Sequence, residues 1–153
     1  MMKRYAVLGQ PIAHSQSPRI HQLFAQAAGT ALSYQALEVS PAALTPTLAR
    51  LHGEGYAGLN ITLPHKIAVM SLCESLSEAA QLAGAVNTLT STASGWAGDN
   101  TDGAGFIRDA KNQGFKITGQ RVLLLGAGGA ARGLLKPLLD EKPAALTLSN
   151  RNP

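Results

Sequence analysis

Residues 121–131 read Arg-Val-Leu-Leu-Leu-Gly-Ala-Gly-Gly-Ala-Ala, an apolar run followed at once by a glycine-rich turn. The run Arg121 to Leu125 predicts a buried strand, and Gly128 to Glu141 predict the helix after it. A lone glycine pattern is more often a plain tight turn, but a strand before it and a helix after it favour the dinucleotide pattern G-x-G-x-x-A, with Ala131 in the third small position. The backbone could then approach a pyrophosphate, whose charge the helix amino end attracts. The predicted cofactor loop is Gly126, Ala127, Gly128, Gly129 and Ala130.

The next predicted strand, residues 144–149, ends in Asn150-Arg151. An NAD-binding unit would place Asp or Glu there to hold the ribose hydroxyls, whereas an arginine suits a 2′-phosphate. Asn150 and Arg151 therefore predict NADP rather than NAD as the cofactor. A complete dinucleotide domain needs further strands and helices, so we expect residues 119–153 to form only the first βαβ unit of a truncated Rossmann-type domain.

Upstream of this unit, strands alternate with helices. Strands are predicted at residues 5–8, 33–39 and 56–61, with a helix from Ser17 and another from Ser40 between them, which gives a βαβαβ pattern. Residues 87–92 and 96–98 predict a hairpin. The fold class is therefore α/β, with a substrate-binding module at residues 1–101, a linking helix at 102–118 and the cofactor unit after it.

Finer predictions concern the helices. The second helix is expected to carry Leu44, Leu48 and Leu51 on one face, and Pro64 to begin a helix through Met70. Ser75 and Glu78 have the spacing of a capping box. Thr101 is expected to cap a helix through Gln113 whose buried stripe contains Phe106, Ile107 and Ala110.

Composition excludes several function classes. The 13 Lys and Arg residues give a net charge of +4 but are dispersed, and aromatic residues make up only 5%, so we expect no nucleic-acid partner. The apolar run from Tyr5 to Leu8 is too short to span a membrane. Cys73 is the only cysteine, which predicts a reduced, cytoplasmic location. The four histidines lack metal-ligand spacing on a common helix, so we expect no metal.

Two polar stretches predict proton chemistry. Asn60-Ile61-Thr62-Leu63-Pro64-His65-Lys66 and Asp99-Asn100-Thr101-Asp102 supply a lysine and an aspartate that could share one proton. Short hydrogen-bonding side chains, Ser15, Ser17 and Asn87, accompany them. Taken alone, Lys66 would be a solvated surface lysine, Asp102 a helix-end acid and Ser17 a helix cap before Pro18.

The combination resembles the amino-terminal portion of the shikimate dehydrogenase family. The resemblance covers nearly the whole chain and rests on several motifs in the family's order. These are residues 9–18 (Gly-Gln-Pro-Ile-Ala-His-Ser-Gln-Ser-Pro), 60–66, 84–88 (Gly-Ala-Val-Asn-Thr), 98–103 (Gly-Asp-Asn-Thr-Asp-Gly), 126–130 and 150–151.

The resemblance implies reversible reduction of 3-dehydroshikimate to shikimate with NADPH, a step of the shikimate pathway to aromatic amino acids. It implies that Ser15 and Ser17 hold the substrate carboxylate, that Thr62, Lys66, Asn87 and Asp102 contact its hydroxyl groups, and that Lys66 and Asp102 are the catalytic pair. His65 stands where the family often has Phe or Tyr, which alters packing beside Lys66 without removing a proposed contact.

Two alternatives stay open at the level of sequence. One is a quinate or dual quinate/shikimate dehydrogenase, although the paired serines favour shikimate and Arg151 favours NADP. The other is that the chain as it stands is a noncatalytic substrate-binding fragment. Truncation would expose apolar faces of residues 123–125 and 134–139, so self-association is also predicted.

Overall fold

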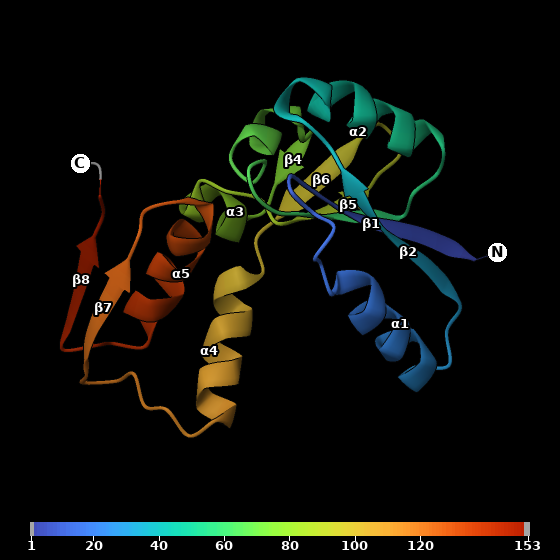
Figure 1. Cartoon of the computed structure of the whole chain (residues 1–153). Coiled ribbons are helices and arrows are strands. Elements are labelled where there is room, and N and C mark those ends of the chain that lie inside the picture. Colours follow the sequence, from blue (N-terminus) through green and yellow to red (C-terminus); the bar gives the residue numbers. More distant parts are fainter. Residues whose placement is uncertain (1, 152–153) are drawn as a thin grey trace.

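The structure is a computed structural model that describes residues 2–151. Its elements form two separate sheets (Figure 1). The larger sheet contains β1 (Lys3–Gly9), β2 (Leu32–Glu38), β3 (Gly58–Ile61), β4 (Ser75–Leu76), β5 (Thr88–Ser91) and β6 (Trp96–Asp99) in the order β2-β1-β3-β5-β6-β4. The smaller sheet pairs β7 (Arg121–Leu125) with β8 (Ala145–Ser149).

The first half of the larger sheet confirms the predicted βαβαβ pattern. β1 pairs in parallel with β2 on one side and with β3 on the other. α1 (Ser17–Ala27) connects β1 to β2, and a short 3-10 helix, η1 (Pro41–Ala43), leads into α2 (Leu44–Gly53) before β3. Figure 1 shows α1 and α2 on opposite faces of the sheet, as alternate crossovers of a doubly wound fold require.

The core lies beneath α2. Leu44, Leu48 and Leu51 are all buried there, as the helical spacing predicted. Trp96 on β6 is also buried, and its indole N–H donates a 3.1 Å hydrogen bond to the carbonyl of Leu48. The indole therefore gains both apolar burial and a partner for its polar atom, which anchors α2 to the hairpin side of the sheet.

The predicted hairpin is confirmed as β5 and β6, which are antiparallel. Two neighbouring predictions are wrong. No helix begins at Pro64, because the chain turns there through a hydrogen bond from the His65 amide to the Thr62 carbonyl, and only a 3-10 helix, η2 (Ala68–Leu72), follows. Ser75 does not cap a helix, because it pairs as β4 with β6. The cap of α3 (Glu78–Ala83) is Ser77, whose hydroxyl accepts the amide of Ala80.

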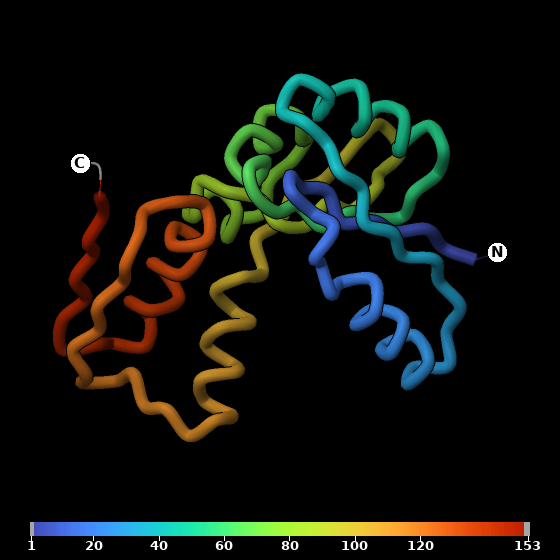
Figure 2. Tube along the Cα trace, viewed as in Figure 1, coloured from blue at the N-terminus to red at the C-terminus, as the bar shows by residue number. Residues whose placement is uncertain are grey.

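α4 (Asp102–Asn112) connects the larger sheet to the βαβ unit formed by β7, α5 (Gly129–Asp140) and β8 (Figure 1). The tube in Figure 2 follows this path from one end of the molecule to the other. α4 and α5 pack very closely. A Cβ added at Gly103 of α4 would clash with the carbonyl oxygen of Gly133 of α5, so only a glycine fits there. Ile107 and Ala110 of α4 are buried as predicted, but Phe106 is 47% exposed.

The prediction that β7 is a buried strand is wrong. Leu123 is 61% exposed and Leu125 is 74% exposed. Side chains two residues apart on a strand point to the same face, so both lie on one face of the small sheet. In the part of the chain that the structure describes, no element packs on that face.

Candidate active site

The predicted site residues converge on one edge of the larger sheet. β1 and β3 run in parallel and end at this edge, β5 begins there because it is antiparallel to β3, and β6 ends there because it is antiparallel to β5. The segments that continue from these strand ends carry the predicted groups. They are Ser15 and Ser17 after β1, Thr62 and Lys66 after β3, Asn87 before β5, and Asp102 after β6.

Lys66 and Asp102 form the ion pair that the sequence predicted. Lys66 Nζ lies 2.5 Å from Asp102 Oδ2, and the two side chains are 15% and 26% exposed. Asp102 is the first residue of α4, where the helix dipole favours a carboxylate. A partly buried, charge-assisted hydrogen bond of this kind holds the ammonium in one place at the mouth of the site.

Asn87 connects this pair to the sheet. Its side-chain amide donates to Asp102 Oδ1 over 2.7 Å, and its Oδ1 accepts the backbone N–H of Thr101 over 3.0 Å. Asn87 is 8% exposed, so its orientation is set by these bonds rather than by solvent. Asp102 therefore has a different donor on each carboxylate oxygen, and its position is fixed from both sides.

Ser15 and Ser17 lie at the start of α1, in the segment that follows β1. Ser17 is the first residue of α1, and Gln16 occupies the capping position without a side-chain cap. The reading of Ser17 as a helix cap is therefore wrong; the Ser15 hydroxyl accepts the Ser17 amide over 3.3 Å instead. Both serines are half-buried, as is Thr62 beside Lys66.

His65 replaces the family's frequent aromatic residue without opening a hole. It is 1% exposed, and its Nε2 makes a 2.7 Å hydrogen bond with the carbonyl of Val39. Because a carbonyl only accepts, Nε2 carries the proton. The imidazole thus connects the loop that carries Lys66 to the residue after β2. This position agrees with the prediction that His65 removes none of the proposed substrate contacts.

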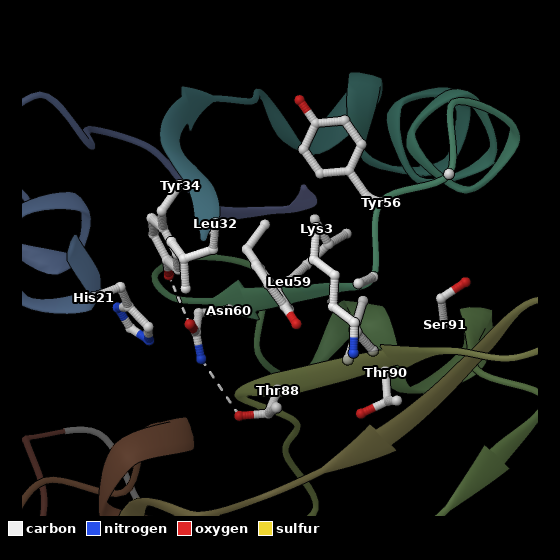
Figure 3. Close-up of a pocket in the computed structure, with 15 residues that line it drawn as sticks. Lys3, His21, Leu32, Tyr34, Tyr56, Leu59, Asn60, Thr88, Thr90 and Ser91 are labelled. Atoms are coloured by element: carbon white, nitrogen blue, oxygen red, sulfur yellow. Dashed lines mark hydrogen bonds between the residues drawn. The ribbon is translucent and has the colours of Figure 1, made fainter. Parts of the chain in front are cut away.

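Sequence reasoning missed a polar chain that lies beside the pair. Tyr34 on β2 donates a 2.6 Å hydrogen bond to Asn60 Oδ1, and Asn60 donates to the Thr88 hydroxyl over 3.4 Å (Figure 3). Thr88 in turn donates to Asn87 Oδ1 over 2.9 Å. Asn60 and Thr88 belong to motifs that the sequence shows, but no local pattern around Tyr34 indicates that its strand pairs close to them.

Residues of this hydrogen-bonded series line part of a cavity of about 660 Å³ in the larger-sheet portion of the molecule (Figure 3). Tyr34, Asn60 and Thr88 line it together with Lys3, Tyr5 and others, whereas none of the six predicted substrate-binding residues does. We place the candidate site at the sheet edge rather than in this cavity, because the ion pair and its hydrogen-bonding partners are there.

The glycine loop lies directly against the lysine. Gly126 has a φ of +106°, which makes the turn after β7, and Gly129 begins α5. A Cβ added at Gly129 would lie 3.1 Å from Lys66 Cβ, so the loop and the lysine are packed together. The amino end of α5, which could attract a phosphate, therefore lies next to Lys66.

The end of β8 also lies beside this loop. β7 and β8 are parallel, and the amide of Gly126 donates to the carbonyl of Ser149 over 2.7 Å. Asn150 and the exposed Arg151 follow immediately. An arginine two residues after Ser149, whose carbonyl is bonded to the glycine loop, is the residue type that suits a phosphate at this place.

Among residues 2–151 no group of three or more His, Cys, Asp and Glu side chains could hold a metal ion. Within the same residues no helix has the length and apolar character needed to cross a membrane.

An α/β sheet with a polar edge, joined to a βαβ unit whose glycine loop adjoins that edge, is typical of the class of dinucleotide-binding α/β proteins. The model of the shikimate dehydrogenase substrate binding domain matches residues 7–89, more than half of the chain. This chain belongs to that family.

Individual relatives agree with this assignment. A shikimate dehydrogenase (NADP(+)) of Xanthomonas euvesicatoria is 50% identical over 99% of this chain and 54% of its own length. Shikimate 5-dehydrogenase of Thermus thermophilus, solved in complex with NADP(H) and shikimate, is 37% identical with a TM-score of 0.92, covering 99% of this chain and 57% of that one. An Ael1 enzyme of Pseudomonas putida is 44% identical with a TM-score of 0.90, covering 98% and 56%. The chain therefore spans about half the length of the curated relatives it matches.

Proposed function

We propose that this chain is the substrate-binding and catalytic portion of an NADP-dependent shikimate dehydrogenase, which reversibly reduces 3-dehydroshikimate to shikimate. The observation that carries the proposal is the 2.5 Å pair of Lys66 and Asp102, bonded to Asn87 and packed against the glycine loop. Relatives named for this activity and cofactor match nearly all of the chain.

The reduction of a ring carbonyl needs a hydride at carbon and a proton at oxygen. NADPH, when bound, supplies the hydride. Lys66 donates the proton to the ring oxygen in this direction and accepts it in the other, because a general acid or base must lie within hydrogen-bond reach of that oxygen. Asp102 keeps the ammonium oriented and accepts a hydrogen bond from a substrate hydroxyl.

The remaining polar groups have separate roles in this proposal. The hydroxyls of Ser15 and Ser17, on the α1 side of the sheet edge, bind the substrate carboxylate. Thr62 and Asn87 hydrogen-bond to ring hydroxyls beside the ion pair. Two groups that bind opposite ends of the ring would fix its carbonyl carbon relative to the glycine loop, which is the positioning that the reaction requires.

The cofactor role belongs to the second sheet. We propose that the loop of Gly126, Ala127, Gly128, Gly129 and Ala130 holds the pyrophosphate, while Asn150 and Arg151 bind the adenosine side and its 2′-phosphate. In this loop Gly126 makes the turn, since its own amide is bonded to Ser149, and the residues after it face the phosphate. The packing of Gly129 against Lys66 supports this, since it brings the loop next to the proposed proton donor.

We further propose a division into a substrate module at residues 1–101, a linking helix at 102–118 and a cofactor unit at 119–153. The separate sheets on either side of α4 support this division (Figure 1). A cytoplasmic location is part of the proposal, supported by the lone cysteine, Cys73, which forms no disulfide.

The direct test is the initial rate of NADP reduction by this chain with saturating shikimate, with quinate in parallel and Lys66→Met as the matched variant. We expect a shikimate rate that exceeds the quinate rate and is lost in Lys66→Met. A faster rate on quinate would overturn the choice of substrate. A folded chain that binds shikimate without turnover would overturn the catalytic half of the proposal and leave a substrate-binding domain.

A further inference from the structure

Tyr34 lies at the far end of the polar chain from Lys66 and is held firmly in place. Its ring stacks on the imidazole of His21, with centroids 4.1 Å apart and an interplanar angle of 16°. The His21 Nδ1 makes a 2.9 Å hydrogen bond with the carbonyl of Ser17, so the stacking partner is itself fixed to the start of α1. The stacked ring holds the Tyr34 hydroxyl within 2.6 Å of Asn60 Oδ1, and the Ser17 side chain bonds the same hydroxyl.

The bonds along this chain have a direction. The Tyr34 hydroxyl donates, so the acceptor end of the Asn60 amide faces it and the amide nitrogen faces Thr88. Thr88 accepts from Asn60 and so has its own proton free for Asn87 Oδ1, 2.9 Å away. Asn87 then presents its amide nitrogen to Asp102 Oδ1.

Without the phenol hydroxyl this direction would be lost at its first step. The Asn60 amide could flip, and its oxygen would then draw the Thr88 proton away from Asn87. Asn87 is also anchored to Thr101: its Oδ1 accepts the Thr101 backbone N–H at 3.0 Å, and its amide nitrogen lies 3.0 Å from the Thr101 hydroxyl. The loss would therefore loosen rather than break its bond to Asp102.

Tyr34 remains a donor across the working range of pH. Burial raises the pKa of Tyr34 to about 12, although a hydrogen bond with the Ser17 side chain opposes this shift. The phenol is therefore protonated near neutrality, where Lys66 and Asp102 would act.

We propose that Tyr34 is a positioning residue, whose hydroxyl fixes the Asn60 amide and, through Thr88 and Asn87, the orientation of Asp102 beside Lys66. Its effect on shikimate binding rests on the proposed function. The hydrogen-bond relay itself does not, because it consists of the protein's own side chains.

The test uses the 15N-labelled chain and the side-chain amide signals of Asn60 and Asn87. Tyr34→Phe removes only the hydroxyl and is expected to shift both amides while the main-chain amides of α2 stay unchanged. Tyr56→Phe is the matched control, because it removes a hydroxyl whose bond, 3.5 Å to Gln35 Oε1, lies outside the relay. Thr88→Val breaks the middle link. Because Asn60 also donates to the Asn87 backbone carbonyl over 3.5 Å, Tyr34→Phe added to Thr88→Val should produce only a reduced further shift at Asn87.

The relay would be overturned if Tyr34→Phe shifted the side-chain amide signal of Asn60 but not that of Asn87. It would also be overturned if Tyr34→Phe shifted the Asn87 signal by the same amount with and without Thr88→Val. Shikimate titration adds a second readout: Tyr34→Phe is expected to weaken binding about three- to tenfold and Tyr56→Phe to leave it unchanged. If the unmodified chain does not bind shikimate, the proposed function fails while the amide signals still decide the relay. Unchanged affinity in Tyr34→Phe, with both amides shifted, would overturn the link to substrate positioning.

Discussion

At the scale of single residues, the candidate site is a set of short, directed hydrogen bonds around one ion pair. Asp102 accepts from Lys66 on one oxygen and from Asn87 on the other. A hydrogen bond to a charged group contributes more than a neutral one, so the Asp102 carboxylate holds Lys66 and Asn87 more firmly than an uncharged side chain would.

Replacing Asp102 with Asn keeps its size but removes the charge that holds Lys66. We expect Asp102→Asn to raise the Kd for shikimate by about tenfold or more, as loss of a charge-assisted hydrogen bond implies. Titration calorimetry measures it. Asp109→Asn is the control, because Asp109 lies on the same helix but bonds only the exposed Gln113. Equal affinities of the two variants would contradict the role of Asp102.

The raised pKa of Tyr34 has a consequence at alkaline pH. The folded state holds the phenolic proton more tightly than the unfolded state, whose tyrosines have the usual pKa of 10.0. The folded state therefore binds more protons between about pH 10 and 12, and the stability contributed by Tyr34 falls as the pH rises through this window. Denaturant unfolding at pH 9 and 11 should show a smaller loss in Tyr34→Phe than in the unmodified chain. An identical loss would contradict the shift.

At the scale of elements, strand direction explains why residues distant in sequence meet. β5 is antiparallel to β3 and β6, so its beginning lies where theirs end, which brings Asn87 to Lys66 and Asp102. The predicted strands and both predicted βαβ units are present. Local patterns could supply these, because hydrophobic period and glycine turns are local signals.

What sequence could not supply depended on pairing between distant segments. The capping-box spacing of Ser75 and Glu78 competed with a pairing of Ser75 with Ala97 that no local pattern reveals. Whether Leu123 is buried or exposed depends on what covers the second sheet, which its own strand does not reveal. The role of Tyr34 depends on the register that aligns β2 with β1, and β1 with β3. The ion pair was predictable only because the motifs resemble a family.

The cap of α3 allows a test at this scale. The Ser77 hydroxyl accepts the Ala80 amide over 3.1 Å and donates to Asp99 over 2.5 Å. Ser77→Ala is expected to lower the free energy of unfolding by about 1–2 kcal/mol, since an N-cap serine is worth that much. Ser71→Ala is the control, because Ser71 is exposed and bonds only a nearby carbonyl. Urea unfolding compares them, and equal stabilities would contradict the capping role.

At the scale of the whole molecule, the βαβ unit meets the rest of the chain where Gly129, at the start of α5, packs on Lys66 in the loop after β3. This contact places the proposed proton donor directly beside the proposed cofactor loop. The second sheet also presents a bare apolar face, on which Leu123 and Leu125 lie side by side. Exposed apolar patches of this kind favour association.

We therefore expect the chain to self-associate at high concentration through the face of β7. Leu125→Ser should reduce association, because it removes apolar area from that face. Leu63→Ser is the matched control, since Leu63 is 75% exposed but lies in a loop of the other module. Light scattering across a concentration series measures the effect. A compact monomer at all concentrations would contradict this expectation.

The central claim is that one edge of the larger sheet binds shikimate, and the most direct measurement is the titration of the 15N-labelled chain with shikimate. We predict saturable shifts that cluster at the amides of Ser15, Ser17, Thr62, Lys66, Asn87 and Asp102. A folded chain that shows no saturable shift, or shifts confined to the cavity around Lys3, Tyr5 and Thr90, would contradict the claim.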